Sequence, residues 1–87
     1  MGFDADQLLL AHGHRARGEY AQAKQILVAL VARDPMNLEA HYLLAWVCVD
    51  TGDKQGARVE FTTVANSAPP DSDMQRETLA ALGRLSR

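Results

Sequence analysis

The chain has 87 residues, of which 47% are hydrophobic and 23% charged, and a formal net charge of -2; these values are typical of one soluble globular domain. Its Lys and Arg residues are scattered, and no apolar run approaches the ~20 residues that span a bilayer, so nucleic acid and membrane are not expected as partners. The single cysteine, Cys48, excludes an internal disulfide.

The N-terminal segment, residues 1–6, lacks the basic and apolar parts of a secretory signal, which indicates a cytoplasmic location. The first helix is expected to begin at Asp4, which would cap it, with Gln7 completing a capping box. This helix is expected to end at Gly18, because glycine readily takes the left-handed conformation that closes a helix.

A second helix is expected over residues 20–33, because Ala23, Leu27 and Leu30 recur at helical spacing. The Asp-Pro pair at 34–35 ends it, since proline cannot continue a helix.

Three further helices are expected in the second half of the chain. Asn37 is a good cap for a helix over residues 38–50, and a turn at residues 52–53 leads to the next, over about 55–67. The last, residues 72–85, opens with a capping box of Ser72 and Gln75. Its apolar residues share one face, which suits a helix that seals a stack; they are Met74, Thr78, Ala81, Leu82 and Leu85.

The sequence repeats itself at an offset of 34 residues. The small residues of the repeat are expected where antiparallel helices approach closely, and Leu27 and Phe61 fill the space one turn further on. The matching positions are Gly18 and Gly52, Ala11 and Ala45, Ala23 and Ala57, Pro35 and Pro69, and the Leu pairs at 9–10 and 43–44.

This repeat resembles the tetratricopeptide repeat, whose second helix carries Ala-x-x-x-Phe and a closing Pro. The matching segments here are Ala23-x-x-x-Leu27 with Pro35 and Ala57-x-x-x-Phe61 with Pro69, while the aromatic positions of both first helices are lost. The resemblance implies an all-α superhelix in a single domain, residues 1–87. Two antiparallel helix pairs, residues 4–37 and 38–71, would be followed by a fifth, capping helix, residues 72–85.

The resemblance also implies that the first helices line a concave groove that binds a peptide or a partner helix. The residues carried over to the groove as partner-binding positions are Leu8, His12, Arg15, Glu39, Tyr42, Leu43, Trp46, Val49 and Asp50. Asp73 and Glu77 would lie at its far edge, where they would repel the C-terminal carboxylate that some members of the family clamp. Tyr42 and Trp46 favour bulky apolar anchors, although Trp46 could instead pack as core against the last helix.

The sequence therefore predicts a protein-interaction module that acts as an adaptor or scaffold. Two alternatives stay open, because two repeats are fewer than the three that usually bury a continuous core. The apolar run at residues 26–32 would leave Ile26 or Val28 partly exposed, so the chain could assemble into a homo-oligomer. It could also be a fragment of a longer repeat array.

No enzyme activity, cofactor or metal is expected. His12 and His14 lie on opposite sides of one helix, and His41 and Cys48 are separated by about 10 Å of helical rise, so neither pair can share an ion. Glycine-rich phosphate loops and nucleophile-elbow motifs are missing from the sequence.

Overall fold

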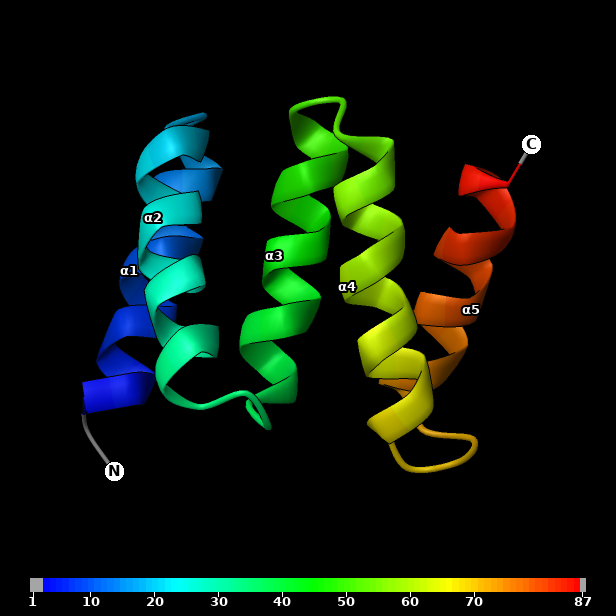
Figure 1. Ribbon diagram of the computed structural model, residues 1–87. Coiled ribbons are helices and arrows are strands. Elements are labelled where there is room, and N and C mark those ends of the chain that lie inside the picture. The colour runs from blue at the N-terminus through cyan, green and yellow to red at the C-terminus, as the bar shows by residue number, and fades with distance from the viewer. Residues whose placement is uncertain (1–2, 87) are drawn as a thin grey trace.

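The computed structural model describes residues 3–86, which form five α-helices in a row (Figure 1). Successive helices run antiparallel and pack against their neighbours in chain order, with an additional contact between α1 and α3. This arrangement confirms the all-α superhelix predicted from the sequence. The bounds of the helices are α1 Phe3–Ala16, α2 Tyr20–Arg33, α3 Leu38–Asp50, α4 Lys54–Ser67 and α5 Asp73–Leu85.

Side-chain caps begin three of the helices. Asn37 accepts a hydrogen bond from the backbone of Ala40 and Ser72 accepts one from Gln75, as the sequence predicts. Asp53 caps α4 in the same way, which is why that helix begins at residue 54. The side chain of Gln75 does not complete the predicted capping box. Instead, it accepts a hydrogen bond from the backbone N–H of Asp71.

The prediction that Asp4 caps the first helix, with Gln7 as its partner in a capping box, is wrong. Helix α1 begins at Phe3, so Asp4 lies inside its first turn, where the positive end of the helix dipole favours a carboxylate. Its carboxylate accepts a hydrogen bond from Arg33 in the last turn of α2. Asp4 therefore joins the start of α1 to the end of α2.

Each pair of helices turns at an equivalent glycine. Gly18 has φ 77° and Gly52 has φ 80°, the left-handed region that side chains other than glycine avoid. The residue after each glycine closes the helix with a 2.8 Å backbone hydrogen bond, from Glu19 to His14 in the first pair and from Asp53 to Cys48 in the second. The sequence repeat is thus also a repeat of backbone geometry.

The core follows the repeat as well. Ala11, Ala23, Ala45 and Ala57 are fully buried, which confirms that small side chains stand where the helices meet. Leu27 and Phe61 are fully buried beside them, and each such side chain contributes about 1.5–3 kcal/mol on burial. Helix α5 extends this core, since Thr78 and Ala81 are buried on the face that the sequence predicts to be apolar.

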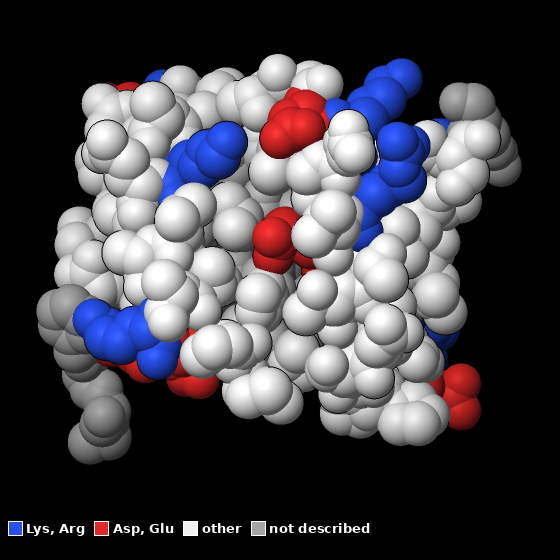
Figure 2. Space-filling model, viewed as in Figure 1, with Lys and Arg blue, Asp and Glu red and all other residues white. Residues whose placement is uncertain are grey.

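The surface is mixed in charge. Figure 2 shows Lys and Arg interspersed with Asp and Glu on the face where α2 lies in front of α1. Val28 on α2 is 46% exposed, as expected for the apolar run at residues 26–32. No helix within residues 3–86 combines the length and the hydropathy that crossing a membrane requires.

Candidate functional site

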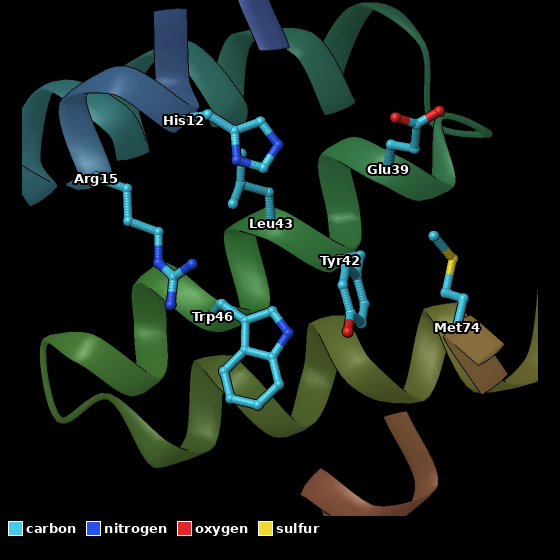
Figure 3. Close-up of a pocket in the computed structure, with 7 residues that line it drawn as sticks. All are labelled: His12, Arg15, Glu39, Tyr42, Leu43, Trp46 and Met74. Atoms are coloured by element: carbon cyan, nitrogen blue, oxygen red, sulfur yellow. The ribbon is translucent and has the colours of Figure 1, made fainter. Parts of the chain in front are cut away.

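A pocket of about 620 Å³ lies between α1, α3 and α5. These are the first helices of the two pairs together with the last helix, and α3 supplies most of the lining (Figure 3). The lining residues are His12 and Arg15 from α1, Glu39, Tyr42, Leu43 and Trp46 from α3, and Met74 from α5.

An aromatic cluster forms the floor of this pocket. The rings of Trp46 and Phe61 meet edge to face with centroids 5.1 Å apart, and Tyr42 lies 6.2 Å from each of them. Phe61 on α4 is fully buried, whereas Tyr42 and Trp46 are half-buried. Trp46 therefore packs against the core through Phe61 of α4 and also lines the pocket, whereas the alternative considered from the sequence was packing against the last helix.

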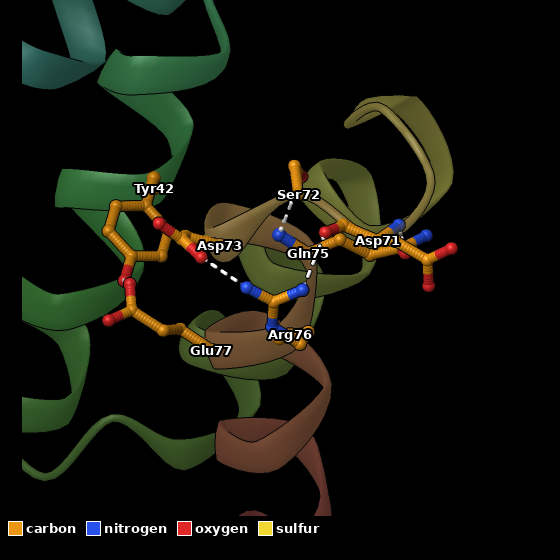
Figure 4. Close-up of polar contacts among 7 residues, drawn as sticks. All are labelled: Tyr42, Asp71, Ser72, Asp73, Gln75, Arg76 and Glu77. Carbon is orange, nitrogen blue, oxygen red and sulfur yellow. Dashed lines mark hydrogen bonds and ion pairs between the residues drawn. The ribbon is translucent and has the colours of Figure 1, made fainter.

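The Tyr42 phenol joins α3 to α5. It donates a hydrogen bond of 2.6 Å to the carboxylate of Glu77 (Figure 4). Burial, followed by this hydrogen bond to Glu77, raises the pKa of Tyr42 above its ordinary value of 10.0. The phenol is thus held neutral as a donor.

Arg15 of α1, which lines the pocket, and Arg76 of α5 are both paired within the chain. Arg15 donates to Asp50 at 2.6 Å, which ties α1 to the end of α3. Arg76 pairs with Asp73 and donates to the backbone carbonyl of Asp71 at 2.7 Å (Figure 4). Both guanidinium groups therefore already face oxygen acceptors of this chain.

A second pocket, of about 610 Å³, adjoins the first, because His12 and Glu39 line both. We call the two adjoining pockets the groove. The remaining lining of the second pocket comes from α1 and the cap of α3; it consists of Asp4, Ala5, Asp6, Leu8, Leu9 and Asn37.

The structure brings most of the sequence-predicted groove residues together. The first pocket contains His12, Arg15, Glu39, Tyr42, Leu43 and Trp46. Leu8 lies in the second pocket, and Asp50 is connected to the first through Arg15. Val49 lines neither pocket and packs against the core.

Sequence reasoning did not assign Met74 to the groove. It placed Met74 only on the face of the last helix that seals the stack. The structure places Met74 in the first turn of α5, across the pocket from α3 (Figure 3). The spacing of the apolar residues over 74–85 predicts which face of α5 packs against the stack. It does not predict how α5 lies relative to α3.

The two histidines outside the groove form side-chain contacts beyond their own helices, and the cysteine is buried. His41 bonds to Glu60 of α4 at 2.6 Å and to the carbonyl of Pro35 at 2.8 Å. His14 bonds to Glu19 at 2.7 Å, and this contact, followed by one from Arg17, lowers the pKa of Glu19. Cys48 is buried, and burial raises the pKa of its thiol. Within residues 3–86, no three His, Cys, Asp or Glu side chains gather where they could hold a metal ion.

A family model described as tetratricopeptide repeat matches residues 14–85. The chain matched no curated protein and no solved structure. The family match covers most of the chain, and the five helices, packed in chain order, fit a stack of such repeats. The chain therefore belongs to the tetratricopeptide repeat family.

Proposed function

We propose that the chain is a non-catalytic adaptor that binds a peptide or a partner helix in the groove. The family serves in general as protein-interaction or scaffold modules and is typically non-enzymatic. We further propose that the partner is a protein or peptide rather than nucleic acid or membrane, and that the chain acts in the cytoplasm.

One observation carries this proposal: Tyr42 and Trp46 both present half-buried rings to one pocket. Its volume of about 620 Å³ falls within the roughly 300–1,000 Å³ of typical ligand pockets. Tryptophan and tyrosine recur as binding hot spots, because each buries a large area and keeps a polar group for hydrogen bonding.

The pocket is also held in shape before any partner arrives. Phe61 packs edge to face against the rings of Tyr42 and Trp46, and Glu77 accepts a hydrogen bond from the phenol of Tyr42. Side chains that are already ordered lose less conformational entropy on binding, which raises affinity. The pocket floor is therefore preorganised for an apolar side chain of a partner.

The test is capture of partner proteins by the wild type and by groove variants. Trp46→Ala is expected to abolish capture, and His12→Ala to weaken it without disturbing the fold, because His12 is exposed. The matched control is Val59→Ala, an exposed residue of α4 outside the groove. If all three variants capture partners as well as the wild type does, with helicity intact by circular dichroism, the groove assignment is refuted.

The second candidate function is self-assembly through the free side of α1. Leu9 and Leu10 are 72% and 52% exposed, whereas Leu43 and Leu44, their equivalents one repeat later, are 3% and 4% exposed because α3 packs against α2. A second copy, or a preceding repeat of a longer array, would cover the leucines of α1 in the same way.

Sedimentation over a range of concentrations decides this alternative. Self-assembly predicts a mass that rises with concentration in the wild type and stays that of a monomer in a Leu9→Ser and Leu10→Ser double variant. A strict monomer at every concentration would remove self-assembly and leave the adaptor as the proposed function.

A further inference from the structure

We propose that the groove selects a cationic peptide. In such a peptide, a bulky apolar side chain fills the pocket beside Trp46, and a neighbouring Lys or Arg lies against Glu39. This inference rests on the proposed function, because it names the chemistry of the partner that the same groove would bind.

Three carboxylates in or beside the groove lack a cationic partner. Asp6 and Glu39 line the groove, Glu77 adjoins it through Tyr42, and all three side chains are exposed. None of them forms an ion pair with a Lys, Arg or His of residues 3–86. The groove thus carries negative charge that this part of the chain leaves uncompensated.

The nearby cations are already engaged. Arg15 is bound to Asp50, and Arg76 is bound to Asp73. The second pocket contains three carboxylates, and no Lys or Arg is among its described lining residues. Arg33 of α2 pairs with Asp4, so the carboxylates of Asp6 and Glu39 are the ones left without a cation within residues 3–86. An acidic partner would meet uncompensated like charge here, whereas a basic partner would supply the missing counterions.

The charged and aromatic side chains follow one another in a definite order along the groove. Figure 3 shows Glu39 and Arg15 at opposite ends of the first pocket, with the rings of Tyr42 and Trp46 between them. Glu39 also lines the second pocket, which continues the acidic end. A bound peptide would therefore place its apolar anchor over the rings and its positive charge toward Glu39 and Asp6.

A long basic side chain also fits the apolar part of the second pocket. Leu8 lines it beside the carboxylates and is half-buried. Lys and Arg lay their aliphatic stems along such surface while the charged head reaches outward. The stem would lie along Leu8, and the head would reach the carboxylate of Asp6 or Glu39.

The test uses a displayed library of random 12-residue peptides selected on the immobilised full chain. Recovered peptides are expected to be enriched in Lys or Arg within a few residues of a bulky apolar residue. Trp46 is the only tryptophan of the chain, so its fluorescence reports binding of the recovered peptides once these are made synthetically without tryptophan. Replacing their basic residues by Glu is expected to weaken binding by about tenfold or more.

Charge variants of the chain then distinguish an effect of the Glu39 carboxylate on binding from an effect of the net charge of the chain. Glu39→Gln is expected to weaken binding of the recovered peptides about threefold, the effect of one exposed ion pair. Gln22→Lys is the matched control, because it shifts the net charge by the same amount at an exposed site of α2 outside the groove. The control is expected to bind as the wild type does, and the difference between the variants is expected to shrink as salt is raised.

The outcomes distinguish the two proposals. Neutral or acidic peptides that still need Trp46 for binding would overturn the charge preference and leave the adaptor standing. If Glu39→Gln and Gln22→Lys weaken binding equally, only net charge matters, and the assignment to Glu39 is overturned. If the immobilised Trp46→Ala chain captures the recovered peptides as well as the wild type does, the adaptor proposal falls and the charge preference falls with it.

Discussion

The phenol of Tyr42 on α3 and the carboxylate of Glu77 on α5 are joined by a hydrogen bond of 2.6 Å, although the residues are 35 positions apart. This contact lies beside the groove and connects the second helix pair to the last helix (Figure 4). The Tyr42–Glu77 hydrogen bond therefore forms only when α5 is packed next to the aromatic cluster.

The contact predicts how Tyr42 titrates. Burial is the larger cause of its raised pKa and Glu77 the second, so Glu77→Gln is expected to lower that pKa only part of the way toward 10.0. Because the raised pKa favours the neutral phenol in the fold, its contribution to stability is complete below the unfolded pKa of 10.0. It is lost as pH rises through the folded value.

Phenolate absorbance measures this pKa. A Tyr20→Phe background leaves Tyr42 as the only tyrosine, and the same variant with Glu77→Gln gives the comparison. Identical titration curves for the two proteins would show that Glu77 does not act on the phenol in solution.

Thr78 predicts a stabilising substitution. Its side chain is fully buried in α5, and its hydroxyl has no hydrogen-bond partner among residues 3–86. Valine has nearly the same shape and no polar atom to desolvate, so Thr78→Val is expected to raise the free energy of unfolding by about 1 kcal/mol.

Urea denaturation checks the effect at Thr78. Thr78→Ser is the control, because it keeps the hydroxyl but removes the buried methyl group, and it is expected to lower stability by about 1 kcal/mol. A less stable valine variant would mean that the hydroxyl finds a partner in solution.

The buried alanines predict sensitivity to added volume. Ala57 is fully buried where the helices meet, so Ala57→Leu is expected to lower the free energy of unfolding by about 1–3 kcal/mol through overpacking. Ala29→Leu makes the same change at an exposed site of α2 and is expected to shift stability little. Thermal melts of both proteins make the comparison. Equal melting temperatures would contradict close packing at Ala57.

Two glycines predict opposite effects of the same substitution. Gly52 has φ 80° and space around it, so Gly52→Ala is expected to cost about 1–2 kcal/mol through backbone strain alone. Gly83 lies inside α5 with open space at its Cβ position, so Gly83→Ala is expected to stabilise the protein by up to about 1 kcal/mol. Chemical denaturation of both variants tests the pair, and a change of the same sign in both would contradict it.

Local signals explain how much of the fold could be predicted. The helices at residues 20–33 and 38–50 have the predicted bounds, because Pro35 stops one and Asn37 caps the other through contacts within a few residues. The prediction at Asp4 failed for a related reason. An Asp near the expected start of a helix is a candidate cap on local grounds alone. The residue that Asp4 contacts, Arg33, lies 29 positions away, so the local sequence does not indicate this contact.

The sequence by itself determined the helices, their turns and the positions of close packing, because these depend on periodicity, caps and small side chains. The tertiary structure alone decided which side chains share a surface. Leu9 and Leu10 have the same local pattern as Leu43 and Leu44, yet only the second pair is buried, because a preceding helix packs there. In the same way, Met74 joins the groove only because α5 packs beside α4 and reaches across to α3.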